Sequence, residues 1–463
     1  MATRTRVADL RTSPQVPQGN VIVLGGGIAG LSAAQTLTAA GMQVTLVEAE
    51  ASCGGTHRSH AIGPYTFDVG SIFYEANARL FALAPGLKEM CPTISRQQRR
   101  IAPGGELLHY PLEPREFLRR RPLELLLALL DLAWSRLRVR RNGGLDAISR
   151  KRLGRRFFES TGLRHYITRF HHVPPEEVSE TFFFHRMGFI DKATRLRALA
   201  RLTLRALFSR GSVANRPRPV LHVRPREGFA PLFERILAQL RAQGVETRLA
   251  TRIDSIRREG SSFVLETDSG TLRASAIVST IPLATLHKAV FGTSCGLEAL
   301  DMTTLFASAS WLDARVGNVL FNFDRHGRWK RATIYSRIYP EPALPREFLA
   351  IECTIPPGGE HAPDVIFADF RGHVEGLGLA RDLALEGHTR VEGCYPLYRP
   401  DTEATLRNTL ERIAQAGIVT VGRQGRFEYL PTSSGVIRRV REELEKAGLK
   451  SPADGPPASG VRA

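Results

Sequence analysis

The feature that most constrains the fold is a glycine-rich turn placed between a buried strand and a helix. The apolar run at residues 21–24 leads into Gly25-Gly-Gly-Ile-Ala-Gly30, and a segment rich in alanine follows at residues 31–40. A second β-branched run, residues 44–47, ends at Glu48. This order predicts a βαβ unit, which implies a parallel sheet covered by helices. We therefore expect an α/β fold.

The spacing of the glycines predicts a dinucleotide site. Gly25, Gly27 and Gly30 fit the pattern G-x-G-x-x-G. In this pattern the first glycine permits a tight turn, the second lets a pyrophosphate approach the backbone, and the third lets the helix pack on the strand. Glu48 ends the following strand, where a carboxylate accepts hydrogen bonds from ribose hydroxyls. The alternative is a glycine turn that binds no ligand.

Five further segments resemble a known group of flavoproteins. They are Gly54-Gly55-Thr-His-Arg58 with Tyr65-Thr-Phe-Asp68-Val-Gly70, Arg226-Glu-Gly228-Phe, residues 244–256, Val278-Ser-Thr-Ile-Pro282, and Val421-Gly-Arg-Gln-Gly-Arg-Phe-Glu-Tyr429. With the glycine turn, and in the same order, they resemble the FAD-dependent amine oxidase, protoporphyrinogen oxidase and phytoene desaturase superfamily, which includes the UDP-galactopyranose mutases. The resemblance covers most of residues 20–440.

The resemblance implies an FAD-binding Rossmann-like domain of the glutathione-reductase type with an inserted mixed α+β substrate or cap domain. The expected boundaries are residues 20–95, 216–290 and 400–450 for the FAD-binding domain, and residues 96–215 and 291–399 for the cap. We expect residues 1–19 to be a flexible leader and residues 451–463 a disordered tail.

The resemblance also implies roles in binding FAD, which we expect to be held without a covalent link. The pyrophosphate would lie on Gly25, Gly27, Ile28, Ala29 and Gly30, and the adenosine ribose on Glu48. Gly55 and Arg58 would lie near the pyrophosphate and the ribityl chain. The backbone of Ile253 would contact the adenine. Gly422 and Arg423 would close over the ribityl and flavin side. The alternative for Arg423 is an ordinary surface turn. No catalytic side chain is assigned, and no metal site is expected.

The implied function is an FAD-dependent oxidoreductase that oxidises or desaturates a small organic substrate by hydride transfer to the flavin. The alternatives are a non-redox mutase acting on a nucleotide sugar and a flavin carrier without enzymatic activity. Two segments depart from the mutase pattern, namely residues 70–72, where a histidine loop is usual, and residues 430–434. Tyr335, Arg337 and Tyr339 are either candidates for binding a diphosphate or exposed strand residues.

The charge is concentrated in one region. The chain has a net charge of +18, and residues 96–226 hold 29 Lys and Arg against 11 Asp and Glu. This region is either a solvated surface or the face for an anionic substrate or an acidic membrane. The apolar stretch at residues 123–134 spans about 18 Å, too short for a bilayer core of about 30 Å. With a basic helix expected after Arg195, it leaves peripheral membrane contact open, the alternative being a packed helical cap.

Two classes of partner or chemistry are disfavoured. Nucleic acid is not expected, because no recognition motif accompanies the basic charge. Five scattered cysteines without C-x-x-C spacing predict neither a disulfide framework nor a cysteine-based zinc site. They fit a reducing compartment, so the expected location is the cytoplasm, with peripheral membrane contact left open. The sequence does not indicate the oligomeric state.

Overall fold

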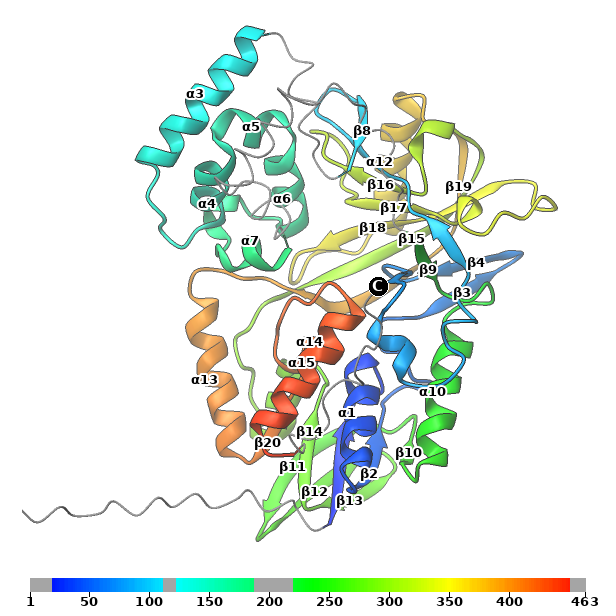
Figure 1. The fold of residues 1–463 in the computed structure, drawn as a ribbon, viewed down its shortest axis with the longest axis vertical. Helices are drawn as coiled ribbons and strands as arrows, with labels where there is room; N and C mark the ends of the chain where they lie inside the picture. Colours follow the sequence, from blue (N-terminus) through cyan, green and yellow to red (C-terminus); the bar gives the residue numbers. More distant parts are fainter. Residues whose placement is uncertain (1–18, 111–121, 187–219, 450–463) are drawn as a thin grey trace, which may run out of the picture.

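The fold has two main sheets, which lie one below the other in Figure 1. The structure, a computed structural model, describes residues 19–110, 122–186 and 220–449. The predicted leader up to residue 18, the tail 451–463 and the basic helix expected after Arg195 lie outside these residues. Within them the α/β class and the βαβ unit are confirmed.

The lower sheet is parallel and has both faces buried. In spatial order its strands are β10 (Glu246–Arg248), β2 (Gln43–Val47), β1 (Asn20–Leu24), β14 (Ala276–Ser279) and β20 (Ile418–Thr420). Val21 and Val23 pack with the helices α1 (Ile28–Ala39), α10 (Ala230–Ala242) and α15 (Ser433–Lys446). Ile22 and Leu24 point the other way. Burial on both sides explains why the strand sequences are continuously apolar.

The second face of the parallel sheet is covered by smaller elements. They are the sheet β11 (Ile253–Glu259), β12 (Ser262–Thr267) and β13 (Gly270–Ala274), with α11 (Leu283–Phe291) and α13 (Thr402–Gln415). Between the two main sheets lie the hairpin β3 (Ser59–Ile62) and β4 (Tyr65–Asp68), and the strands β5 (Phe73–Glu75), β9 (Val220–Val223) and β6 (Thr93–Ser95).

The upper sheet is mixed. In spatial order its strands are β19 (Ala380–Pro396), β15 (Ala299–Leu312), β18 (Glu347–Ile355), β17 (Arg331–Ile334), β16 (Val319–Asn322), β7 (Gln98–Ile101) and β8 (Leu107–His109). Leu305 and Ala307 on one face pack with α12 (Pro363–Gly376). Phe306 on the other face stacks on Phe67 of β4, with ring centres 4.9 Å apart. One face of this sheet is therefore directed at the FAD-side elements.

A helical part adjoins the upper sheet. It contains α3 (Pro122–Arg138), α4 (Leu145–Leu153), α5 (Arg155–Ser160), α6 (Leu163–His171) and α7 (Thr181–Arg186). In Figure 1, α3 lies at its outer edge. Among the described helices, none combines the length and the apolar character that a membrane span requires.

One predicted strand is wrong in part. The alternation at residues 332–339 predicts a strand, but β17 ends at Ile334 and a 3-10 turn, η5 (Tyr335–Arg337), follows. Tyr335 and Tyr339 are buried rather than exposed, and their hydroxyls contact the backbone of Asp68 and Arg224. Arg337 binds Glu347, with Nε 3.1 Å from the carboxylate. This trio is neither an exposed strand nor a set of free groups for a diphosphate.

A buried ion pair between β4 and the residue after β9 lies against this turn. Nε of Arg224 lies 2.8 Å from a carboxylate oxygen of Asp68, and both side chains are almost fully buried. The other guanidinium N–H groups donate to the carbonyls of Thr66, Pro225 and Arg226. The guanidinium also lies over the ring of Tyr339, 4.4 Å from its centre. Because these donors all find acceptors, the charge is tolerated without water.

We predict that Asp68→Asn lowers the free energy of unfolding by about 3–5 kcal/mol, because it leaves the Arg224 charge buried without a counterion. Urea unfolding followed by circular dichroism measures the loss. The matched control is Glu341→Gln, which breaks the exposed pair between Glu341 and Arg226 and is expected to cost at most about 1 kcal/mol. Equal losses in the two variants would contradict the role given to the buried pair.

Candidate functional site

The candidate site lies at the carboxyl ends of the parallel strands. The segments that follow β1, β2, β14 and β20 begin with Gly25, Glu48, Thr280 and Val421, and all four emerge at the same edge of the sheet. In open parallel sheets, ligands bind outside this edge, where loops from neighbouring strands diverge. The segments that the sequence singles out as separate motifs are thus brought together.

The glycine turn is held in a shape that only glycine permits. Gly25 has φ +99° and donates its N–H to the carbonyl of Val47 at 2.7 Å. A Cβ on Gly30 would lie 1.7 Å from the carbonyl oxygen of Gly25, so the helix and the turn are in direct contact. The Thr280 hydroxyl donates to the Leu24 carbonyl at 2.7 Å and packs beside Gly25. Thr280 belongs to this site, although the sequence assigned it no role.

The turn leaves the start of α1 open to an anion. Gly27 is the N-cap residue; no side chain caps the helix, and its first turn contains no acidic residue. The N–H groups at such a helix start attract negative charge. Gly27 faces Gly55, since a Cβ on Gly55 would lie 3.2 Å from the Cα of Gly27. The two glycines, in backbone contact, leave a gap free of side chains in front of the helix N-terminus, where a pyrophosphate would fit with Ile28 and Ala29 beside it.

Glu48 is held by the backbone on both of its oxygens. It accepts hydrogen bonds from the N–H groups of Gly26 and Glu50, and its side chain is largely buried. Thr251 donates its N–H to the carbonyl of Glu48 at 2.9 Å, which brings the start of β11 and Ile253 to the same end of the sheet. Each carboxylate oxygen keeps a lone pair for a further donor, such as a ribose hydroxyl.

The loop after Gly55 adds an exposed cation and a neutral histidine. Arg58 donates through Nε to the carbonyl of Gly55 at 2.8 Å, and half of its side chain is exposed. His57 packs edge to face on Phe229, with ring centres 5.2 Å apart. Burial lowers the pKa of His57 to about 4, so its imidazole is neutral near pH 7. The sequence pattern indicated no role for His57, although this residue lies within Gly54-Gly55-Thr-His-Arg58.

Gly422 and Arg423 close the site from the far end of the chain. Gly422 has φ +79°, and a Cβ on it would lie 2.5 Å from the Cβ of Ala29. Arg423 donates to the carbonyl of Cys394 at 2.9 Å, and its guanidinium lies over the rings of Tyr395 and Tyr429. The surface-turn alternative for Arg423 is wrong. Its buried Nε has no partner among the described residues, and is therefore a donor that a bound group would satisfy.

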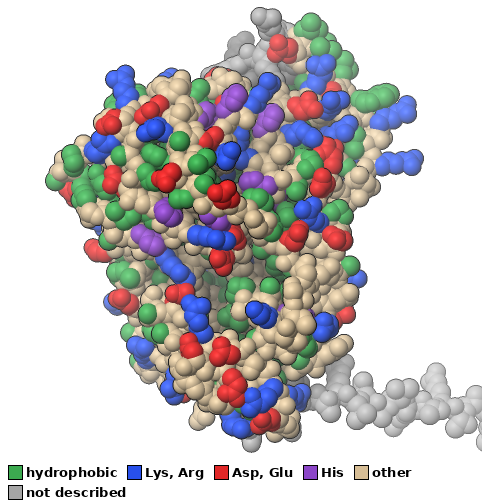
Figure 2. Space-filling model, turned by 180° about the vertical axis from the view of Figure 1, so that it is seen from behind, with side chains coloured by type: hydrophobic (Ala, Val, Ile, Leu, Met, Phe, Trp, Pro, Cys, Tyr) green, Lys and Arg blue, Asp and Glu red, His purple; other side chains and the backbone are tan. Residues whose placement is uncertain are grey.

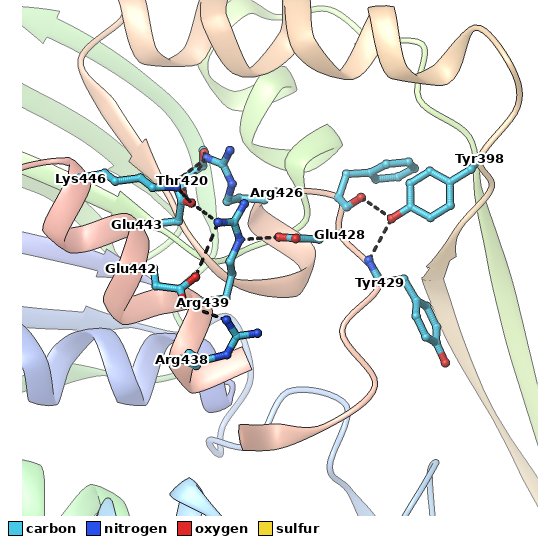
Figure 3. A network of polar contacts seen from close by, with 11 residues as sticks. Tyr398, Thr420, Arg426, Glu428, Tyr429, Arg438, Arg439, Glu442, Glu443 and Lys446 are labelled. Carbon is cyan, nitrogen blue, oxygen red and sulfur yellow. Dashed lines mark hydrogen bonds and ion pairs between the residues drawn. The ribbon is translucent and has the colours of Figure 1, made fainter. Parts of the chain in front are cut away.

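A polar network fixes the segment that follows Arg423 (Figure 3). The hydroxyl of Tyr398 donates to the carbonyl of Phe427 at 3.0 Å and accepts the N–H of Tyr429 at 2.9 Å. Arg439 of α15 binds Glu428 and, through its other nitrogen, Glu443. These contacts set the direction of the Tyr429 ring and, through it, the place of Arg423.

A charged cluster on the upper sheet borders the same tyrosines. Nζ of Lys330 lies 2.9 Å from both the Glu352 carboxylate and the Tyr395 hydroxyl, and Arg331 binds the other oxygen of Glu352. Burial raises the pKa of Glu352, but Arg331 and Lys330 outweigh it and bring the pKa to about 2. Burial lowers the pKa of Lys330, but Glu352 outweighs it and raises the pKa above its usual value. All three groups are therefore charged near neutral pH.

We predict that Gly27→Ala folds but binds the dinucleotide at least about tenfold more weakly. The new methyl group meets only the Cα of Gly55, at 3.8 Å, so the protein itself accommodates it. It narrows the gap in which the pyrophosphate is expected. Equilibrium dialysis of FAD against the apoprotein measures the affinity.

The matched control is Gly372→Ala, in the exposed part of α12 with no atom near the new methyl group. It is expected to raise the free energy of unfolding by about 0.5–1 kcal/mol and to leave FAD binding unchanged. An unchanged affinity in Gly27→Ala would show that the gap does not hold the cofactor.

The chain is similar to flavoproteins over almost its entire length. Residues 28–330 match the model of the family "Flavin containing amine oxidoreductase". A reduced UDP-galactopyranose mutase superposes with a TM-score of 0.74 at 16% identity, covering 94% of this chain and 96% of that one. A candidate protoporphyrinogen oxidase from Exiguobacterium sp. 255-15 gives 0.70 at 18% identity, covering 93% and 98%.

A third structure, cyclohexylamine oxidase from Brevibacterium oxydans IH-35A, gives a TM-score of 0.59 at 16% identity and covers 93% of this chain and 99% of its own. The three superpositions show a shared fold. The family match covers well over half of the chain and therefore shows the family. The cofactor is FAD, which the glycine gap, the helix start and Glu48 fit. The chain is a member of the flavin-containing amine oxidoreductase family.

Proposed function

We propose that the chain is an FAD-dependent oxidoreductase that oxidises or desaturates a small anionic organic substrate. The observation that carries the proposal is the charged cluster beside the cofactor cradle. The Lys330 ammonium and the Arg423 guanidinium both lie over the Tyr395 ring, 4.2 Å and 5.1 Å from its centre. With Arg331 they contribute three positive charges against the one of Glu352. A site with this excess favours an anion.

Bound FAD supplies the acceptor for a hydride, and the protein supplies binding, orientation and electrostatics. Gly27, Gly55 and Glu48 would hold the ADP half, and Nε of Arg423 would donate to an acceptor on the cofactor or the substrate. Lys330 is charged and fully engaged by Glu352 and Tyr395, so it orients and attracts but does not take up a proton. The rings of Tyr395 and Tyr429 form an apolar wall that excludes water.

The second candidate is a non-redox mutase acting on a nucleotide sugar. The superposition on a UDP-galactopyranose mutase over nearly the full length of both chains favours it, and the same cations suit a diphosphate. Residues 70–72 and 430–434 argue against it, since they depart from the mutase pattern. The two candidates differ in the oxidation state that the flavin must have before substrate binds.

We predict that the purified protein is yellow, and that denaturation releases FAD into the filtrate because the cofactor is held without a covalent bond. Stopped-flow absorbance under anaerobic conditions then distinguishes the candidates. An oxidoreductase bleaches the oxidised flavin band when its reducing substrate is mixed in. A mutase converts UDP-galactopyranose only after dithionite has reduced the flavin.

Each outcome has a definite consequence. Bleaching by small carboxylated substrates supports the oxidoreductase. Conversion of UDP-galactopyranose by the reduced protein alone replaces that proposal with the mutase. A colourless protein that takes up no FAD in dialysis would contradict both candidates.

A further inference from the structure

The helix α3 turns its apolar side chains outward. Eleven large hydrophobic side chains are exposed among the described residues, and seven of them lie on this helix. The seven are Leu123, Leu126, Leu127, Leu129, Leu130, Trp134 and Leu137. Leu137 is 84% exposed and Leu123 is 66% exposed. Isolated exposed leucines are common, but a contiguous set of this size marks an interaction surface.

The spacing of these residues defines a single face, here called the α3 face. Leu123, Leu126, Leu130 and Leu137 follow one another at intervals of three, four and seven residues, which places them on one side of a helix. Among the residues of α3 whose side chains the structure describes, the buried ones are small: Ala128 and Ser135. The helix is thus amphipathic, but its apolar side faces outward. In an ordinary surface helix the apolar side packs in the core.

Two contacts hold the inner side of α3, and neither involves a side chain of the α3 face. Gly154, between α4 and α5, approaches so closely that a Cβ on it would lie 3.0 Å from the Cα of Leu132. The carboxylate of Asp131 accepts the N–H of Arg156 at 2.9 Å, at the start of α5. These contacts hold the helix and leave the α3 face exposed as far as the described residues are concerned.

Basic residues border the α3 face. Arg136 and Arg138 lie in the last turn of α3, and Arg155 and Arg156 at the start of α5 are exposed. In Figure 2, which is seen from behind, hydrophobic and basic side chains mingle on the upper right edge, the side on which α3 lies.

We infer that the α3 face docks on an acidic lipid bilayer, with the helix lying in the plane of the headgroups. An apolar stripe bordered by arginines is the pattern of interfacial helices, whose apolar side enters the acyl boundary while the cations contact anionic headgroups. Trp134 carries the guanidinium of Arg138 4.7 Å above its ring, a pairing that suits the headgroup level. The 17 residues of α3 span about 25 Å, so the helix lies on the bilayer rather than across it.

The charge distribution disfavours a second copy as the occupant. In a parallel pairing of two copies along this face, Arg136 and Arg138 would meet their own copies. In an antiparallel pairing, Arg155 and Arg156, which lie beside Asp131 near the middle of α3, would do so. A bilayer containing anionic lipids offers negative charge along the whole helix. The observations therefore commit to a lipid surface.

Sedimentation of the FAD-loaded full chain with vesicles tests this inference. We expect binding to phosphatidylcholine vesicles with about 30% phosphatidylglycerol, little binding to pure phosphatidylcholine, and a loss of binding as NaCl rises from about 0.05 M to about 0.5 M. The triple variant L126Q/L130Q/L137Q is expected to lower binding at least about tenfold. It should fold, because the three side chains are exposed and Gln has a helix propensity close to that of Leu. Its visible flavin spectrum checks this.

Two control variants distinguish vesicle binding through the α3 face from nonspecific adsorption. Val365→Gln removes an exposed apolar side chain from α12 and should leave vesicle binding unchanged. Tryptophan emission should shift to the blue on binding, and Trp134→Phe should abolish most of that shift. The inference is overturned if acidic vesicles do not bind the chain, or if the triple variant binds them as well as the unaltered chain. It is also overturned if light scattering shows a dimer that the triple variant dissociates while neither form binds vesicles.

Discussion

The pairing of Arg224 with Asp68 is the contact on which the junction between the upper sheet and the hairpin β3–β4 depends, because Tyr335 and Tyr339 pack and bond against it. A carboxylate and a guanidinium without water are stable only when nearly every lone pair and N–H has a partner. The hydroxyl of Ser59 donates to Asp68 and accepts the N–H of Phe229 at 2.9 Å. The ion pair therefore fixes the hairpin that begins directly after Arg58, and with it the start of α10. The same ion pair therefore positions the loop that carries Gly55 and Arg58 beside the cofactor gap.

The parts of the site that the sequence predicted are those whose geometry is local. Gly25, Gly27 and Gly30 reveal their role because the turn, the helix start and the close packing all lie within six residues. Glu48 is recognisable because it ends the very next strand. Arg423 was recognisable only through the resemblance, since its rings and its carbonyl acceptor come from β19 and from the segment after α14.

The charged cluster shows why the other residues of the site could not be predicted from the sequence. Arg331 and Glu352 are direct cross-strand partners in the register of β17 and β18, and opposite charges facing each other across a pair stabilise a sheet. That register depends on how β17 and β18 pair across the turn and the loop between them. The periodicity of the sequence does not encode this pairing. The alternation at residues 332–339 misled for a related reason. Burial of Tyr335 and Tyr339 against Arg224 overrides the local preference for a strand.

The contact of Gly422 with Ala29 has a consequence for how the protein is made. Strand β1 pairs with β14, and β14 pairs with β20, so the sheet joins the first and last parts of the described chain. During synthesis the helix start at Ile28 emerges early, but the wall formed by Gly422 and Arg423 emerges almost four hundred residues later. Parallel pairing over such separations is slow, because a long loop must close before any contact rewards it. The nascent chain therefore carries a glycine turn without a completed site until residue 423 has been made, and FAD meets the full set of contacts only after these distant strands have paired.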